Sequence, residues 1–409
     1  MPPPFDDEKQ ASCRPDRGVD RLRNTSCGDF GLSNYLRNRQ VCVIGGGIAG
    51  LTAATALAQR GAQVTVLERA PAQTEVGAGL QISPNAGRVL DALGLAQAVD
   101  SVSVRSEGVV MHSAAGRQIA VLPLSTRQPG AAFRMIQRAR LVEVLGDAAR
   151  AAGADLQFGQ QVAMPLQTDA TLLVGADGLH SVVRPLLNGP ETPFFTGQTA
   201  WRTLIPDPVE DPFARVFMGP GRHLVSYPLG GGLRNIVAVQ ERADWVAESW
   251  SHQDEPANLR AAFAHFGGPV PGWLSRVETC GIWGLFRHEI ASRWHDDKHV
   301  ILGDAAHPTL PFMAQGAVMA IEDAWILAAC LDAIPDQGAA LARYQALRLP
   351  RVRKVINAAN GNARNYHLTG PARIVAHLGL GALSRIAPAT LPSRFDWIYD
   401  YDPVAERVA

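Results

Sequence analysis

The sequence predicts an α/β fold in which a parallel sheet is interrupted by an inserted antiparallel sheet and followed by C-terminal helices. Three observations support this prediction. A short apolar strand at residues 41–44 leads into a glycine-rich loop and an Ala/Leu-rich helix. Between residues 194 and 242 the pattern changes to short alternating segments separated by glycines. An apolar strand then returns at residues 299–302, which indicates that the chain re-enters its first domain.

The first unit is a strand, a helix and a second strand. Residues 41–44 are apolar and mostly β-branched, as expected for a strand buried on both faces. The helical pattern of residues 51–60 ends at Gly61, and residues 63–68 alternate as a strand that ends at Glu68. This order predicts a right-handed βαβ unit in a parallel sheet.

The same patterns predict the remaining helices and strands. Helical periodicity recurs at residues 86–93, 138–152 and 322–331, and a buried strand is expected at residues 172–174. Alternation at residues 199–205 and 224–227 predicts strands of the inserted sheet. The predicted organisation is an N-terminal extension (1–39), a first domain in two parts (40–184 and 281–345), an inserted sheet (185–280) and a C-terminal helical segment (346–409).

Composition narrows the class of protein. The 409 residues carry 38 basic and 38 acidic side chains, so no charge argument favours a nucleic-acid or membrane partner. The five cysteines are scattered and odd in number, which argues against a disulfide framework, a zinc site or a dithiol couple. We expect no metal. Residues 1–39 lack apolar periodicity and resemble a disordered or loosely docked extension rather than a signal peptide, so a cytoplasmic protein is expected.

A dinucleotide motif lies at the first turn. Gly45, Gly47 and Gly50 form G-x-G-x-x-G directly between a strand and a helix, and Ile48 and Ala49, between the last two glycines, are expected to contact the nucleotide as well. The first glycine permits the tight turn, the second admits a pyrophosphate and the third allows close packing of helix and strand. Glu68, followed by Arg69, ends the second strand, where a carboxylate accepts ribose hydroxyls. The motif predicts a Rossmann-like domain that binds FAD or NAD.

Two further motifs distinguish between these nucleotides. Gly175-Ala176-Asp177-Gly178 follows one strand, and Gly303-Asp304-Ala305-Ala306-His307-Pro308 follows another and leads to Gln315-Gly316. In this combination and order, from residue 40 to residue 402, the chain resembles the class A flavoprotein monooxygenases. These share the fold of para-hydroxybenzoate hydroxylase, and the nearest resemblance is to salicylate, 3-hydroxybenzoate and hydroxynicotinate hydroxylases. Shorter segments agree, including Gly77-Ala78-Gly79-Leu80-Gln81 and the stretch that begins at Gln137-Arg138.

The resemblance implies bound FAD, transient NADH or NADPH, and dioxygen. Asp304 is expected at the ribityl chain, Arg138 at the FAD phosphate or ribose, and Asp177 where FAD and NAD(P)H both pass. Gln81 is expected to contact the cofactor, and His307, Pro308 and Pro311 are expected to line the pocket beside the isoalloxazine. The helix that begins at Gln315, Gly316 and Ala317 would direct its N-terminus at the flavin, where negative charge collects on reduction.

Fewer residues indicate where the substrate would bind. His223 and Tyr227 are four apart in a strand-like run, so they share a face, with Cα atoms about 13 Å apart. A His and a Tyr at this spacing contact the substrate in the similar hydroxylases, and His can take a phenolic proton near neutral pH. Arg202 is a candidate for a bidentate contact with a substrate carboxylate. A structural His–Tyr pair and a structural ion pair of Arg202 are the alternatives.

The predicted function is hydroxylation of a small aromatic acid through a flavin C4a-hydroperoxide, by a monomer or homodimer. Pro311 and Phe312 stand where some similar enzymes place Gln or His, which predicts a more apolar pocket wall. Hydroxylation of a purine- or pyridine-type heterocycle is therefore an alternative. A catalytically idle FAD-binding protein is another, because Thr171 replaces the usual acidic residue and the segment from Asp155 to Thr171 is short.

Overall fold

The computed structural model describes residues 35–73, 79–124, 132–208, 211–243 and 252–409, apart from the side chains of 362–364. Gly77 and Ala78 lie outside the described residues, as does most of the expected N-terminal extension. The described chain begins before the expected boundary at residue 40. Leu36 is fully buried in the core, and the Asn38 amide donates to the Gly61 carbonyl, so this turn is docked against the first βαβ unit.

The expected parallel sheet is present. Its five strands have the order β16-β9-β1-β2-β8, and every described pairing is parallel. The bounds are β1 Gln40–Ile44, β2 Gln63–Glu68, β8 Asp155–Phe158, β9 Leu172–Gly175 and β16 His299–Ile301. Because β16 pairs with β9, the segment after the inserted sheet contributes a strand to the parallel sheet.

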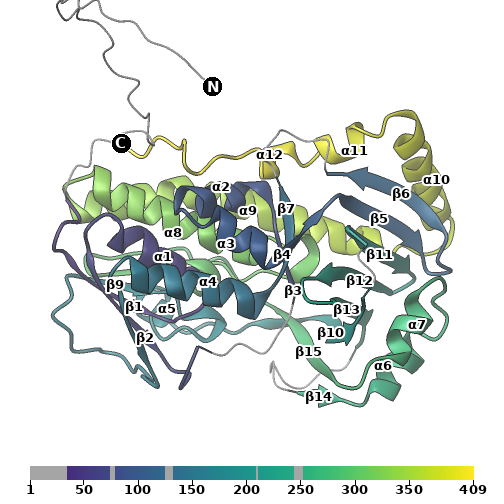
Figure 1. Cartoon of the computed structure of the whole chain (residues 1–409), viewed down its shortest axis with the longest axis horizontal. Helices are drawn as coiled ribbons and strands as arrows, with labels where there is room; N and C mark the ends of the chain where they lie inside the picture. Colours follow the sequence, from purple (N-terminus) through teal and green to yellow (C-terminus); the bar gives the residue numbers. More distant parts are fainter. Residues whose placement is uncertain (1–34, 74–78, 125–131, 209–210, 244–251) are drawn as a thin grey trace, which may run out of the picture. The chain divides into compact units, whose positions relative to one another are not determined.

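Three helices pack together beside this sheet. They are α1 (Ile48–Ala58), α4 (Arg138–Ala151) and α8 (Gly316–Ala333), and α1 lies between the other two (Figure 1). The helix α2 (Pro84–Ala92) packs on α8, and α3 (Ala96–Ser101) packs on α2 and α4. Burial of Leu51, Leu57, Leu145 and Ile321 in one core explains why these Ala- and Leu-rich segments are helical.

Two helices are longer than predicted. The helix α8 begins six residues before the expected start at 322, and α9 (Gln337–Tyr366) crosses the expected boundary at 346 and continues through Pro350. Tyr344, Arg348, Val352 and Val355 are all buried, so packing of one face of α9 compensates for the hydrogen bond that Pro350 cannot donate.

The second sheet has eight strands in the order β14-β15-β10-β13-β12-β11-β5-β6. The bounds are β5 Gly108–Ser113, β6 Gln118–Pro123, β10 Phe194–Pro206, β11 Phe213–Gly219, β12 Arg222–Leu229, β13 Leu233–Glu241, β14 Gln253–Asp254 and β15 Cys280–Arg287. The inserted segment alone was expected to form it, but β5 and β6 come from the first part of the chain. The pairing of β11 with β5 is parallel and the others are antiparallel.

The two faces of this sheet have different neighbours. Trp201, Phe217 and Leu224 on one face pack against α6 (Pro256–Ala262) and α7 (Val270–Ser275). The opposite face, which carries His223 and Tyr227, meets several other elements (Figure 1). These are β3 (Gly79–Ile82), β4 (Ser103–Ser106) and β7 (Phe133–Gln137) of a small third sheet, the turn η3 (Pro311–Met313), α10 (Gly370–Ile386) and α11 (Thr390–Ser393).

Three short elements complete the description: α5 (Arg184–Asn188), the turn η1 (Gly178–His180) and α12 (Asp396–Tyr399). Cys42, Cys280 and Cys330 are buried and free. Within the described ranges, no group of His, Cys, Asp and Glu side chains is arranged to hold a metal ion. None of the described helices is long and apolar enough to cross a membrane.

Candidate active site

The glycine loop between β1 and α1 has the geometry that its three glycines predict. Gly45 has φ +104°, and a Cβ there would lie 2.4 Å from the Ala176 carbonyl oxygen. A Cβ at Gly50 would lie 1.9 Å from the Gly45 carbonyl oxygen, so strand and helix are in direct backbone contact. At Gly47, by contrast, no described atom beyond the chain neighbours lies within 4 Å of a Cβ. The loop is therefore closed behind Gly45 and Gly50 and open at Gly47.

Glu68 is held beside this loop by the backbone. Its two carboxylate oxygens accept the amide protons of Gly46 at 2.6 Å and Ala70 at 2.7 Å. Each oxygen retains a second lone pair. The expected contact with ribose hydroxyls is thus compatible with the structure and stays a prediction.

A cleft of about 460 Å³ extends from the glycine loop. Its lining includes Gly45, Gly47, Glu68, Arg69, Arg138, Asp177 and Asp304. Asp177 Oδ2 accepts the Val182 amide proton at 2.7 Å, whereas Oδ1 is buried without a hydrogen-bond partner among the described residues. Burial raises the pKa of Asp177, and its hydrogen bonds oppose that rise. Asp304 is exposed to the cleft and is therefore accessible to a ligand.

The N-terminus of α8 lies near Asp304. A Cβ at Gly316 would be 4.0 Å from Asp304 Oδ1 and 3.1 Å from Thr309 Oγ1. Ala314, just before the helix, has φ +53°, a conformation that non-glycine residues adopt where the surroundings impose it. Ala317 in the first turn is half-buried. The free amides of this helix end are therefore positioned by a constrained turn.

The side chain of Gln315 faces inward, into a buried polar network. It donates to Ser83 Oγ at 3.1 Å, and its oxygen lies 3.4 Å from Asn85 Nδ2. Asn85 donates to Glu322 at 2.6 Å, and Glu322 pairs with Arg348 at 2.6 Å. The Gln315 side chain thus supports the helix end, and a cofactor contact from this residue would involve its backbone.

His307 belongs to the same network and not to a cavity wall. Its Nε2 lies 2.5 Å from Asp323 Oδ2, and Asp323 Oδ1 accepts from Arg348 Nε at 2.7 Å. The expectation that His307 lines the pocket was wrong, because its side chain is fully buried, and the position of Pro308 beside the flavin stays a prediction. Neither is among the described residues that line the cavities at this site. The Asp323 carboxylate, about two turns into α8, holds His307 in the core instead.

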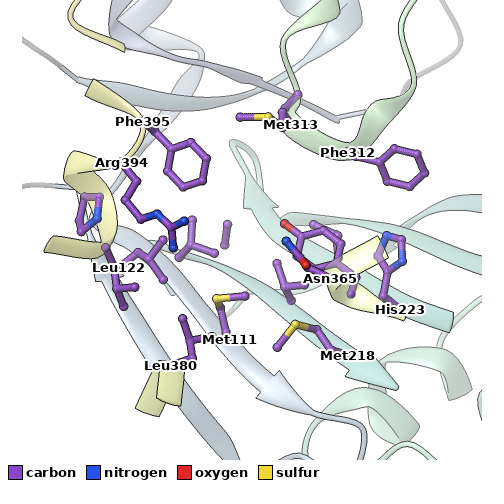
Figure 2. A pocket seen from close by; sticks show the side chains of 18 of the residues that line it. Met111, Leu122, Met218, His223, Phe312, Met313, Asn365, Leu380, Arg394 and Phe395 are labelled. Atoms are coloured by element: carbon purple, nitrogen blue, oxygen red, sulfur yellow. The ribbon is translucent and has the colours of Figure 1, made fainter. Parts of the chain in front are cut away.

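A second cavity, of about 580 Å³, lies over the face of the large sheet that carries His223 (Figure 2). Its body is apolar and includes Met111, Leu122, Met218, Val225 and Leu380. Pro311, Phe312 and Ala314 line it, as does Gln81 of β3. This placement brings the turn before α8 against the sheet. The expected positions of Pro311 and Phe312 at the pocket are consistent with this wall, and Gln81 lies here rather than in the cleft.

His223 forms one polar end of the cavity. It is buried, and its ring lies 5.9 Å from Phe312 and 5.1 Å from Tyr366, centroid to centroid. Burial, with a smaller contribution from His367, holds the pKa of His223 well below its usual value. His223 is therefore a neutral base at physiological pH, and burial raises the pKa of the adjacent Tyr366 to about 12.

Tyr227 and Arg202 are not found among the described residues that line the cavity. Tyr227 is buried, and a Cβ at Gly79 would lie 2.7 Å from its ring, so β3 packs directly on it. The guanidinium of Arg202 lies 4.8 Å from the centre of the Trp283 ring, and burial lowers its pKa. The expected arrangement of an aromatic ring flanked by His223 and Tyr227 is therefore not seen, because β3 covers Tyr227.

The opposite polar end of the cavity was missed by the sequence analysis. Figure 2 shows Arg394 and Phe395 across the cavity from His223 and Phe312. Arg394 and His377 line the cavity, as do Asn365 and Tyr366, which lie on the side of His223. The Arg394 backbone amide donates to the Pro392 carbonyl, whereas its side chain is exposed and forms no hydrogen bond or ion pair with the described residues. A lone Arg after an apolar helical stretch gave no motif, since its position depends on how α9, α10 and α11 fold back.

Comparison with known proteins decides the family. The FAD binding domain family matches residues 38–171 and 166–359. A 3-amino-4-hydroxybenzoate 2-monooxygenase, PtmB3 of Streptomyces platensis, is 35% identical over 92% of this chain and 100% of its own length. The chain belongs to the class A flavoprotein monooxygenases. A 3-hydroxybenzoate 6-hydroxylase of Klebsiella oxytoca is 30% identical over 82% of this chain and 91% of its own.

A solved structure supports the same family. HpxO of Klebsiella pneumoniae, in complex with FAD and uric acid, superposes with a TM-score of 0.75 at 25% identity, covering 85% of this chain and 94% of its own. The protein is thus an FAD-dependent aromatic monooxygenase. The residues of this flavoprotein fit that cofactor. The backbone is open at Gly47, an unpartnered Asp177 oxygen lies in the cleft wall, and Asp304 is exposed beside the α8 N-terminus.

Proposed function

We propose that this flavoprotein uses NADH or NADPH and dioxygen to hydroxylate a small aromatic acid that carries a ring hydroxyl group. The observation that carries the proposal is the cavity of about 580 Å³ with a neutral base, His223, at one end and an exposed cation, Arg394, at the other. Its apolar middle suits an aromatic ring. The names of the similar hydroxybenzoate enzymes agree with such a substrate.

The cofactor would be held by the cleft. The loop at Gly45, Gly47 and Gly50 and the first turn of α1, with Ile48 and Ala49, offer free amides to a pyrophosphate. Glu68, Arg138, Asp177 and Asp304 offer polar contacts along the cleft. When bound, FAD supplies the oxygen-activating chemistry that the sequence resemblance implies. The chain itself orients the substrate, excludes water and moves a proton.

His223 acts as the base in this proposal. The substrate hydroxyl donates to His223 Nε2 and transfers its proton there, which makes the ring a stronger nucleophile. Phe312 and Pro311 shield the ring from water beside the turn that leads into α8. The carboxylate of the substrate binds Arg394 with two parallel hydrogen bonds. Arg394 thereby takes the role that the sequence analysis gave to Arg202.

The first test compares acids with their neutral counterparts. The FAD-loaded protein is assayed for NADH and NADPH oxidation with 3-hydroxybenzoate, 3-amino-4-hydroxybenzoate, salicylate and 6-hydroxynicotinate, each paired with its carboxamide. We expect at least one acid to stimulate oxidation and its carboxamide to do so poorly. Equal stimulation by acid and carboxamide would contradict carboxylate recognition.

The second test removes the cation. A charge-assisted pair contributes about 1.5–3 kcal/mol, so Arg394→Met should raise KM for the accepted acid by roughly 10- to 100-fold. KM for the carboxamide should hardly change. Arg394→Lys keeps the charge without the bidentate geometry and should be intermediate. An equal loss for acid and carboxamide would show that Arg394 only shapes the cavity.

A heterocycle hydroxylase is the second candidate. The uric acid in the superposed HpxO complex favours it, since a purine offers ring nitrogens and carbonyls in place of a carboxylate. Urate and hypoxanthine therefore belong in the same assay. Stimulation by a purine, unaffected by Arg394→Met, would support this candidate over the aromatic acid.

A further inference from the structure

A chain of three side chains leads from the cavity to the protein surface. His223 Nδ1 lies 2.7 Å from His367 Nε2, and His367 Nδ1 lies 2.8 Å from Glu241 Oε1. His223 is at the cavity end, His367 is buried in the turn after α9, and the Glu241 side chain at the end of β13 is 55% exposed. These groups come from three separate segments and are connected by two successive hydrogen bonds.

The carboxylate fixes the direction of every hydrogen bond in this chain. An ionised carboxylate only accepts, so His367 Nδ1 must carry the proton and donate to Glu241. Neutral His367 then has a lone pair on Nε2, which accepts the proton on His223 Nδ1. Neutral His223 consequently presents the lone pair of Nε2 on its remaining side. Glu241 does not contact the cavity directly, but through His367 it determines which nitrogen of His223 is protonated. His223 therefore faces the cavity with the unprotonated Nε2, as a base.

Both imidazoles are neutral in this arrangement. Burial lowers the pKa of His367, and Glu241 partly opposes the effect, while burial and His367 lower the pKa of His223. The other titratable group that packs against His223 is Tyr366 of α9, whose raised pKa keeps it protonated. Phe312 on the remaining side is apolar. A proton that arrives at His223 therefore has a single hydrogen-bonded route among these groups.

We propose that His367 and Glu241 form a proton relay that sets the tautomer of His223 and carries the substrate proton to the surface. The step balances without a further reagent. The substrate O–H bond breaks as the proton binds His223 Nε2, and the Nδ1 proton moves to His367 Nε2. The Nδ1 proton of His367 then moves to Glu241 Oε1, from which water removes it. The relay rests on the proposed role of His223, but its tautomers can be measured without turnover.

The first experiment is NMR of the FAD-loaded protein with ¹⁵N-labelled histidine, with His223→Gln and His367→Gln used for assignment. We expect both rings to be neutral with the proton on Nδ1. Glu241→Gln should disturb this state, because an amide can also donate to His367 and reverse the hydrogen bonds. A proton on Nε2 of His223 in the unaltered protein would overturn the proposal, whatever reaction the enzyme catalyses.

The second experiment follows proton movement with a chromogenic probe, 4-hydroxy-3-nitrobenzoate, whose absorbance reports ionisation of its hydroxyl group. Rapid mixing should show ionisation on binding. Loss of an acid–base relay should slow it roughly tenfold or more in Glu241→Gln and His367→Gln. The exposed Glu278→Gln serves as the control and should match the unaltered protein. Added imidazole should restore the ionisation rate in His367→Gln, and added formate should restore it in Glu241→Gln. In both cases the rate should rise with the concentration of the additive.

Two outcomes separate the relay from the proposed function. Unchanged ionisation rates in both relay variants would exclude the relay while leaving hydroxylation intact. Hydroxylation of no panel compound, together with the expected tautomers and the expected slowing with the probe, would leave the relay supported and the substrate class wrong. Failure of the probe to ionise in the unaltered protein would contradict His223 as the base and with it the relay.

Discussion

Gly47 and Gly50 lie three residues apart in the loop before α1, but a side chain would have opposite consequences at the two positions. A Cβ at Gly50 would lie 1.9 Å from the Gly45 carbonyl oxygen, so Gly50→Ala should destabilise the protein by about 1–3 kcal/mol or more through overpacking. Gly47 has φ −81° and open space around its Cβ position. Gly47→Ala should therefore leave the melting temperature unchanged.

The two variants should separate again in cofactor binding. Gly47→Ala should weaken FAD binding, because its methyl group points to where the pyrophosphate approaches the backbone. Thermal denaturation of the apoprotein and fluorescence titration with FAD measure the two effects independently. Unaltered FAD affinity in Gly47→Ala would place the pyrophosphate elsewhere.

The buried Asp323 carboxylate should make the stability of the folded protein depend on pH. Burial alone would raise its pKa, but His307 and Arg348 lower it from 3.8 to about 2. A carboxyl group with a lowered folded-state pKa contributes stability above its unfolded pKa, and this stability is lost as the pH falls. The contribution should therefore disappear as the pH falls from 3.8 toward about 2.

The matched variants test that contribution. Asp323→Asn should cost about 3–5 kcal/mol near neutral pH, because it removes one carboxylate from a buried ion pair. The loss should shrink in acid. Asp147→Asn, whose side chain is 82% exposed, is the control and should change stability little. Urea denaturation across the acid range measures both, and a pH-independent loss would contradict the assigned charge of Asp323.

At the level of elements, the sequence predicted the parts that depend on local pattern. The strands β1, β2 and β9 are short apolar runs beside glycines, and the helices α2 and α4 fall within two residues of their expected bounds. The large sheet was predicted less well. Pairing of β11 with β5 joins segments a hundred residues apart in the sequence, and no local pattern encodes that partner.

The candidate site, too, has one part that local motifs predict and one part that they do not. The cleft residues follow from motifs, because the glycine loop and Asp304 sit at the ends of parallel strands. The cavity does not follow from motifs. Tyr227 was expected there from strand alternation, but alternation cannot reveal that β3 covers one end of the face. Arg394 and His367 were not expected, since the turns around α9, α10 and α11 bring them to the sheet.

At the level of the whole described fold, Arg351 connects the buried network to the C-terminal segment. It donates to Glu322 at 2.7 Å and to the carbonyls of Trp397 and Ile398 at 3.2 Å and 3.0 Å. Its guanidinium lies 3.8 Å from the centre of the Tyr401 ring. Trp397 also lines the cavity, so Arg351 fixes part of the substrate wall from outside it.

Arg351→Lys should therefore loosen the C-terminal segment, because an ammonium cannot make all of these contacts at once. We expect faster hydrogen exchange at residues 395–401 and a severalfold higher KM, with kcat less affected. The exposed Arg353→Lys is the control. Unchanged exchange in Arg351→Lys would mean that other contacts, such as those of Arg88 with Tyr399 and Tyr401, suffice to hold the segment.

The most direct test of the central claim is incubation of the FAD-loaded protein with reduced nicotinamide, isotope-labelled dioxygen and the aromatic acid that best stimulates oxidation. We predict a ring-hydroxylated product that contains one labelled oxygen atom, with one nicotinamide oxidised for each product molecule. His223→Gln should oxidise nicotinamide with little product and more hydrogen peroxide. Oxidation that yields hydrogen peroxide alone in the unaltered protein, or a product whose oxygen comes from water, would contradict the account.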